Sequence, residues 1–191
     1  NGTTNYILTK MDRDGADLDA VLKRAQDKGY AEKDPTADIE GFDACRKIAI
    51  LSSLAYGSQV DFEDIYTEGI TGLSALDFKY AKELGMAIKL LATSRRAGDS
   101  FYAMVAPMMI GEDHPLHGVN GVFNGILVEG NMADKLMFYG RGAGSLPTAS
   151  AVVADVVEMA KNRGETLLTS WSSEKLPLAD KGTWERQFFV R

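Results

Sequence analysis

An acidic loop followed at once by a predicted helix holds the side chains best suited by type and spacing to chemistry. The loop covers residues 30–41, and its carboxylates include Glu32 and Asp38. Asp43 and Lys47 lie four residues apart at the start of the helix, so they share one helix face. Glycines bound the loop, as they often do in loops that wrap a ligand. This concentration of acids around one lysine favours a ligand-binding site.

A purely structural explanation of the same residues is also open. Acidic residues before a helix stabilise its N-terminus by capping it and by favourable interaction with the helix dipole. A surface Asp–Lys pair at this spacing contributes only about 0.3–0.5 kcal/mol. Composition alone favours this explanation, whereas the bounding glycines and the single lysine on the helix face argue against it.

The hydrophobic pattern predicts an α+β domain that would position this loop. Apolar residues at helical spacing predict helices over residues 4–12, 17–28, 42–56, 74–84 and 146–161. Apolar runs between turn signals predict strands over residues 86–95, 100–110, 122–130 and 134–139. Residues 58–72 are predicted to be a connector with a short strand or turn at 64–68. Helices followed by adjacent strands indicate a mixed β-sheet of about four to five strands with helices packed on one face.

A glycine-rich turn, Gly140-Arg141-Gly142-Ala143-Gly144, lies between the last predicted strand and the last helix. It is not a dinucleotide fingerprint, because the position of the third required glycine is Ser145 and no βαβ unit follows. The glycines could serve tight strand-to-helix packing alone. Alternatively, backbone N–H groups at the start of the helix could bind an anionic group.

The composition excludes several classes of protein. The net charge of −6 argues against a nucleic-acid partner, which requires a basic surface. No run of 18 apolar residues occurs, so we expect no transmembrane helix and no membrane partner. The single cysteine, Cys45, is compatible with a cytoplasmic location. His114 and His117 lack further Cys or His partners, so we expect no metal site.

Three segments resemble the homoserine dehydrogenase family. The run Gly-Tyr-x-Glu-x-Asp-Pro-x-x-Asp-x-x-Gly-x-Asp-x-x-x-Lys, residues 29–47, looks like the family signature that lines the amino-acid site. The opening Asn-Gly-Thr-Thr-Asn-Tyr-Ile-Leu resembles the family segment just after the nucleotide-binding domain. The glycine turn from residue 140 resembles the late glycine turn of the family. The matches occur in family order and span residues 1 to about 162, so the resemblance implies a fold of the dehydrogenase C-terminal catalytic-domain type.

The resemblance also implies ligands and the residues that bind them. The family interconverts aspartate semialdehyde and homoserine with NADP or NAD in threonine, methionine and isoleucine biosynthesis. Glu32 would bind the substrate ammonium. Further substrate contacts would come from Gly2, Thr3 and Tyr30. The cofactor would contact the turn residues Gly142, Ala143 and Gly144.

Three residues match catalytic positions of the family. Hydride delivery to a carbonyl leaves negative charge on oxygen, and Lys47 matches the cation that stabilises it. Asp43 would hold and orient this lysine. Asp38 would lie beside the reacting oxygen as a hydrogen-bonding or proton-relay partner. Because neighbouring carboxylates favour the charged form of a lysine, Lys47 would act as a polariser and proton donor rather than a free base.

The same resemblance predicts how the chain is organised. Residues 1–163 would form a catalytic and dimerisation domain, and residues 164–191 a linker or tail. The ending at 187–191 resembles the first strand of a C-terminal regulatory domain. A nucleotide-binding domain that holds most of the cofactor would precede Asn1, so we expect the chain to be a fragment without activity of its own. The β-rich stretch 86–130 would pair two subunits in a homodimer.

Two other functions are open on sequence grounds. One is an amino-acid-binding regulatory module that kept this fold and lost its chemistry. The presence of all four charged residues, Glu32, Asp38, Asp43 and Lys47, argues against such decay. The other is a related dehydrogenase that acts on a different semialdehyde, although Glu32 favours an amino-acid substrate. The sequence leaves undecided the choice between NAD and NADP, inhibition by threonine and fusion to an aspartate kinase.

Overall fold

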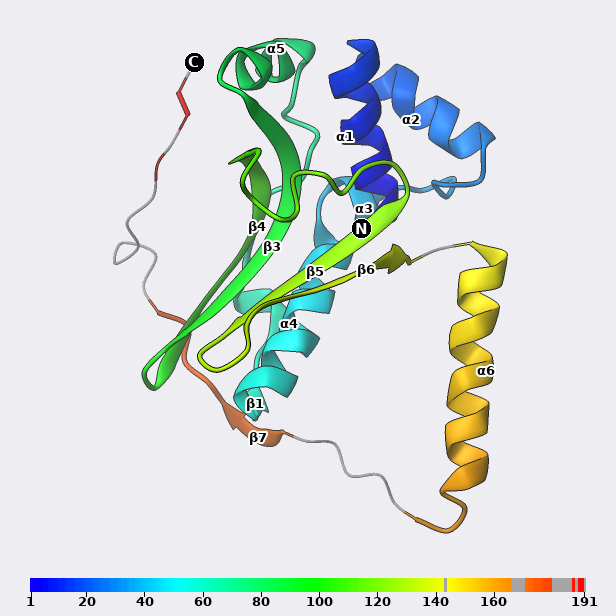
Figure 1. Cartoon of the computed structure of the whole chain (residues 1–191), viewed down its shortest axis with the longest axis vertical. Helices are drawn as coiled ribbons and strands as arrows, with labels where there is room; N and C mark the ends of the chain where they lie inside the picture. Colours follow the sequence, from blue (N-terminus) through cyan, green and yellow to red (C-terminus); the bar gives the residue numbers. More distant parts are fainter. Residues whose placement is uncertain (143, 166–170, 180–186, 188, 191) are drawn as a thin grey trace.

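The polypeptide folds as an α+β structure in which helices come first, short strands and a further helix follow, and a run of four longer strands comes next (Figure 1). The computed structural model describes residues 1–142, 144–165, 171–179, 187 and 189–190. The helices are α1 (Gly2–Asp14), α2 (Leu18–Asp27), α3 (Thr36–Ile39), α4 (Phe42–Tyr56), α5 (Ala75–Glu83) and α6 (Ser145–Lys161), with a 3₁₀ turn at Phe62–Asp64. The strands are β1 (Ser58–Gln59), β2 (Tyr66–Thr67), β3 (Met86–Ala97), β4 (Ser100–Gly111), β5 (Phe123–Gly130), β6 (Asp134–Arg141) and β7 (Ser172–Lys175).

The described strands are divided among three sheets. The central sheet has the order β2-β4-β3, with β2 parallel and β3 antiparallel to β4, so it is mixed as predicted. The antiparallel hairpin β5-β6 and the short parallel pair β1-β7 are separate. The expectation of one sheet with four to five strands is therefore wrong in this respect. The sequence pattern specifies strands, but it does not specify which strand edges pair.

One face of the β3–β4 hairpin carries the helices, which agrees with the prediction. Side chains alternate along a strand, and the register pairs Ile88 with Met109 and Ala92 with Val105. Ile88 belongs to the core cluster that residues of helices α1, α2 and α5 form. Phe101 and Val105, on the same face of β4, pack with helix α4. A single apolar face thus fixes both groups of helices relative to each other.

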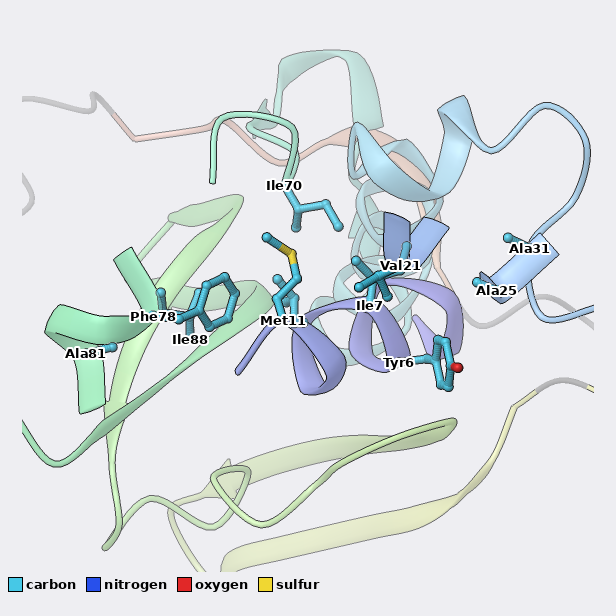
Figure 2. Packing of buried hydrophobic residues seen from close by; sticks show 11 residues of the cluster. Tyr6, Ile7, Met11, Val21, Ala25, Ala31, Ile70, Phe78, Ala81 and Ile88 are labelled. Carbon is cyan, nitrogen blue, oxygen red and sulfur yellow. The ribbon is translucent and has the colours of Figure 1, made fainter. Parts of the chain in front are cut away.

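Helix α1 is the centre of the first core cluster (Figure 2). Ile7 and Met11 are fully buried. They pack in the same cluster as Val21 of α2 and Ile70 of the segment between β2 and α5. This burial contributes about 1.5–3 kcal/mol for each large apolar side chain. Because α1 is held by its middle turns, its N-terminal turn has a fixed place at one end of the cluster.

Helix α5 begins at a capping box that the sequence also carries. The backbone N–H of Ser74 donates to the carboxylate of Asp77 at 2.8 Å, and the Ser74 hydroxyl contacts the same oxygen. Such a box satisfies donors that a helix start leaves unpaired. The observed bounds of α5 therefore follow the predicted helix over residues 74–84 closely.

The tail contributes structure that the sequence pattern does not indicate. Strand β7 pairs with β1, and the Trp171 indole N–H donates to the side chain of Gln59 at 3.0 Å. Leu178 forms a parallel bridge with Phe101 of β4. The predicted strand at 187–191 falls partly outside the described residues, and its described residues have no regular structure.

Helix α6 stands apart from the sheets in Figure 1 and buries none of its described residues. It nevertheless exposes several large apolar side chains: Leu146, Val152, Val153, Val156, Val157 and Met159. No helix in the described part of the chain has the length and apolar character needed to cross a membrane.

Candidate active site

The acidic loop, the start of α1 and the first turns of α4 meet around a cleft of about 430 Å³. Its walls contain all four charged residues that the sequence singles out: Glu32, Asp38, Asp43 and Lys47. Three of the predicted substrate contacts, Gly2, Thr3 and Tyr30, line the same cleft. The predicted residues are therefore brought together from segments that are up to 45 residues apart in the sequence.

Lys47 lies at the rim of this cleft and is held by Asp43. The Lys47 Nζ atom is 2.7 Å from the Asp43 Oδ2 atom, one helical turn away. The lysine side chain is 63% exposed and that of Asp43 is 31% exposed, so the pair itself stabilises the fold little. A cation that is tethered but still accessible is available to a ligand in the cleft.

Asn1 joins the two aspartates of the site. Its side-chain amide donates to Asp38 at 2.6 Å and to Asp43 at 2.7 Å. The amide oxygen of Asn1 accepts a hydrogen bond from the backbone N–H of Thr4 at 3.0 Å and thereby caps helix α1. One residue therefore links the helix start, the acidic loop and helix α4.

These contacts shift the acidity of Asp43. Burial raises the pKa of its carboxyl group. Hydrogen bonds from Lys47 and Asn1, together with the charge of Lys47, lower this pKa by more than burial raises it. The net pKa lies below the ordinary value for an aspartate. Asp43 therefore stays ionised and keeps its hold on the lysine throughout the neutral range.

The acidic loop contains a short helix where the sequence predicts only a loop. The Asp34 carboxylate accepts hydrogen bonds from the backbone N–H of Thr36 at 3.1 Å and from its hydroxyl at 2.6 Å, and these bonds lower the pKa of Asp34. Helix α3 follows and carries Asp38 into the cleft. Gly41 then reverses the chain with φ +81°, a conformation that favours glycine, before α4 begins.

A close backbone approach fixes the back of the loop. The N–H of Ile70 donates to the carbonyl oxygen of Ile39 at 2.7 Å. At Gly69, an added Cβ atom would lie 2.5 Å from the Cα atom of Glu40. Only glycine allows this contact, so the position of Asp38 depends on a residue that does not itself line the cleft.

The opposite end of the loop is anchored on α1. The Thr3 hydroxyl donates to the backbone oxygen of Tyr30 at 2.8 Å, and the Tyr30 ring lies 5.1 Å from that of Tyr6. The backbone oxygen of Glu32 accepts a hydrogen bond from the Gln26 side chain at 3.0 Å. The Glu32 side chain itself is exposed within the cleft, as a binding group for a cationic ligand should be.

The glycine turn reaches the cleft through one residue. Gly142 lines it, and a Cβ atom there would lie 2.6 Å from the Nδ2 atom of Asn124. Ala143 lies outside the described residues. Gly144 precedes α6 with φ +117° and is not among the residues that line the cleft.

The sequence did not single out two residues of this site. Asn1 carries a recognisable signal, because asparagine is a preferred residue at a helix N-cap. The hydrogen bonds from Asn1 to the aspartates, however, depend on segments 37 and 42 residues away. Asn124 of β5 also lines the cleft, and no local pattern marks it, since it lies inside an apolar strand.

A second, smaller cavity of about 60 Å³ shares Asn1 and Asn124 with the cleft. Lys89 of β3 borders it and is 6% exposed; its Nζ atom donates to the backbone oxygen of Val119 at 2.5 Å and to the side chain of Asn120 at 2.9 Å. Burial lowers the pKa of Lys89. The lysine thus ties the loop before β5 to the central sheet. The described residues contain no group of three His, Cys, Asp or Glu side chains arranged to hold a metal ion.

Comparison with known proteins gives the family. Residues 1–157 match the family described as homoserine dehydrogenase. A homoserine dehydrogenase from Synechocystis sp. is 55% identical over 163 residues, which cover 83% of this chain. The crystal structure of a homoserine dehydrogenase from Thiobacillus denitrificans has a TM-score of 0.82 and 46% identity over 94% of the chain. The chain therefore belongs to the homoserine dehydrogenase family.

The match covers only part of these relatives. The chain spans 38% of the length of the Synechocystis protein and 42% of the Thiobacillus denitrificans chain. A hyperthermophilic archaeal homoserine dehydrogenase mutant, solved in complex with NADPH, is 30% identical with a TM-score of 0.67; the match covers 84% of this chain and 45% of that one.

Proposed function

We propose that this chain supplies the substrate-binding and catalytic groups of a homoserine dehydrogenase, which interconverts L-aspartate 4-semialdehyde and L-homoserine. The observation that carries the proposal is the cleft that joins Glu32 to the Lys47–Asp43 pair. An amino acid with a reacting oxygen on its side chain needs an anion for its ammonium group and a cation for that oxygen. This cleft offers both within the reach of one small molecule.

In this proposal, Glu32 binds the α-ammonium group, and the start of α1 lies against the rest of the amino-acid backbone. Lys47 donates a hydrogen bond to the aldehyde oxygen and stabilises the negative charge that develops there during reduction. Asp43 orients the lysine, and Asp38 lies on the adjacent wall as a hydrogen-bonding or proton-relay partner for the same oxygen.

The nicotinamide cofactor would supply or accept the hydride when bound. The family resemblance assigns cofactor contacts to the glycine turn, of which Gly142 lines the cleft. We assign NADP as the preferred cofactor, with support from the NADPH complex of the archaeal relative. Most of its binding would come from a nucleotide-binding domain outside residues 1–191.

We further propose a cytoplasmic homodimer that acts in threonine and methionine biosynthesis. A cytoplasmic location agrees with the single buried thiol of Cys45. Dimer formation agrees with the apolar side chains that the β5–β6 hairpin exposes.

Homoserine oxidation by the complete polypeptide that contains this sequence tests the proposal. We expect homoserine-dependent NADPH formation, and we expect Glu32→Gln to raise the KM for homoserine at least tenfold because the ammonium loses its anionic partner. Glu63→Gln, which makes the same change in an exposed 3₁₀ turn, should leave KM unchanged. Homoserine binding without any oxidation would instead indicate a regulatory amino-acid module, and the absence of both would remove the assignment.

A further inference from the structure

Asn124 carries a buried hydrogen-bond donor that is not used within the described part of the chain. Its Nδ2 atom has an accessible area below 1 Å², and no described group accepts a hydrogen bond from it. Buried polar side-chain atoms are nearly always paired, because an unpaired buried amide loses its hydrogen bond to water without replacement. An unpaired donor in the wall of a cleft therefore indicates an acceptor that arrives with a ligand.

The surrounding backbone holds this amide in place. Asn124 pairs with Gly140 in the register of the β5–β6 hairpin. The Asn5 side chain donates to the backbone oxygen of Phe123 at 2.9 Å, which ties the start of β5 to helix α1. The backbone that carries the donor is thus fixed by its partner strand and by helix α1.

Two glycines lie next to this amide. An added Cβ atom would lie 2.6 Å from Nδ2 at Gly142 and 3.6 Å from it at Gly2. A side chain at Gly142 would displace the amide, whereas a Cβ atom at Gly2 would make an ordinary van der Waals contact with it. Neither neighbour supplies a side-chain acceptor, because glycine has none.

The distribution of charge around the cleft decides what this donor can bind. Carboxylates dominate the wall formed by the acidic loop and α4, where Lys47 is the cation among the described lining residues and is already paired with Asp43. Asn124 lies on another side, next to the first turn of α1. The N–H groups of Gly2 and Thr3 lack intrahelical partners there, and the positive end of the helix dipole favours an anion. Asn124 therefore lies beside the unpaired N–H groups at the start of α1, with Gly2 as its direct neighbour.

We propose that Asn124 recognises the α-carboxylate of the amino-acid substrate through a hydrogen bond from Nδ2, and that it makes the site selective for substrates that carry this group. The assignment rests on the proposed function, since it concerns the same cleft and the same class of ligand. It adds a specificity-determining residue from β5 to a site otherwise built by α1, the acidic loop and α4.

A donor that is buried and unpaired before the ligand binds distinguishes substrates that carry a carboxylate from analogues that lack it. A substrate with the carboxylate pairs the amide, whereas an analogue without it leaves the amide unpaired. Sites built in this manner reject the analogue more strongly than apolar pockets do. A hydrogen bond to a charged acceptor is worth about 1.5–3 kcal/mol, which corresponds to roughly 10–100-fold in affinity.

The test compares three ligands in the complete polypeptide that contains this sequence. The ligands are L-homoserine, 3-aminopropan-1-ol, which lacks the carboxylate, and 4-hydroxybutanoate, which lacks the ammonium. Binding is measured by calorimetry and by competition with homoserine oxidation. The variants are Asn124→Ala, which removes the donor, and Asn124→Asp, which keeps the shape and places an anion at the same position. Asn131→Asp, on the exposed β5–β6 turn, controls for the change of charge.

We expect Asn124→Ala to weaken homoserine and 4-hydroxybutanoate binding at least tenfold and to change 3-aminopropan-1-ol binding less than twofold. Asn124→Asp should weaken homoserine more than Asn124→Ala does, because two carboxylates then face each other. A merely structural role predicts the opposite order, since aspartate preserves the packing better than alanine. Equal losses for all ligands, no loss for homoserine, or a milder effect of aspartate than of alanine would overturn the inference. If wild-type protein binds no homoserine, the proposed function itself fails, which is a different result.

Discussion

At the scale of single residues, the tether between Lys47 and Asp43 gives the mechanism its sharpest test. Lys47 is mostly exposed, so its replacement should not unfold the protein. We expect Lys47→Ala to lower kcat about 100–1,000-fold, which is typical for loss of one electrostatic stabiliser of an oxyanion. The KM for homoserine should change much less, because the charge on oxygen develops only in the transition state.

Steady-state kinetics of the complete polypeptide check this prediction, with Lys23→Ala on the exposed side of α2 as the matched control. Lys47→Arg should recover only part of the loss, because a guanidinium group keeps the charge but not the position of the ammonium. An unchanged kcat in Lys47→Ala would exclude the lysine from the chemical step.

Asn1 allows the hydrogen bonds of the site to be separated from the stability of α1. Serine caps a helix as well as asparagine does, but its hydroxyl cannot donate to Asp38 and Asp43 together. The hydrogen bond from Asn1 lowers the pKa of Asp43, so Asn1→Ser should raise that pKa toward its ordinary value. The acid limb of the pH profile of kcat/KM should therefore move to higher pH in this variant. The value of kcat/KM should also be lower than in the wild type at every pH.

The pH profile of kcat/KM measures this shift, with Asn162→Ser at the end of α6 as the control. The same depressed pKa also makes the stability of the fold depend on pH. Because the pKa of Asp43 is depressed in the folded state, its stabilising contribution is present above the unfolded pKa and declines as the pH falls through the folded pKa. An acid limb that does not move would show that Asn1 acts on the helix alone.

At the scale of elements, the sequence predicts what local patterns encode. The helices α4 and α5 and the strands β3 and β4 follow from apolar spacing and bounding glycines. The charged residues of the cleft were also predicted, because a family motif holds them within residues 29–47. Asn124 and the β1–β7 pair could not be predicted, since both depend on which distant segments meet. The same reason explains why the predicted single sheet is three sheets in the described chain.

Gly69 tests how one element holds another. A Cβ atom there would overlap the backbone between α3 and α4, which includes the Cα atom of Glu40 at 2.5 Å. We expect Gly69→Ala to lower the free energy of unfolding by about 1–3 kcal/mol, as overpacking against backbone usually does. Chemical denaturation measures this change. Gly72→Ala is the control, because an added Cβ atom meets nothing within 4 Å there.

Gly69→Ala should also affect substrate binding in the cleft. The loop that Gly69 supports carries Asp38, so displacement of this backbone should raise the KM for homoserine in Gly69→Ala and not in Gly72→Ala. Equal stability and equal KM in the two variants would mean that the loop adapts freely, and the close approach would then have no bearing on the cleft.

At the scale of the whole molecule, one face of the β5–β6 hairpin is too apolar to be an ordinary solvent surface. Ile126 pairs with Phe138 and Val128 pairs with Leu136, so the four side chains share a face. Their exposed fractions are 43%, 64%, 46% and 49%. A contiguous exposed patch of this kind usually marks an interaction site. A second copy of the same hairpin presents an identical apolar face, which suits a symmetric pair.

We expect the complete polypeptide to sediment as a dimer at micromolar concentration, and we expect Phe138→Glu to shift it to a monomer because two charges would be buried where the copies meet. Met132 lies in the turn of the same hairpin and is 92% exposed. Met132→Glu therefore adds the same charge beyond the apolar face and should leave the dimer intact. Because the first turn of α1 is tied to the start of β5, loss of the dimer should also raise the KM for homoserine. A wild-type monomer at all concentrations, or a Phe138→Glu dimer as stable as wild type, would show that this face has another partner.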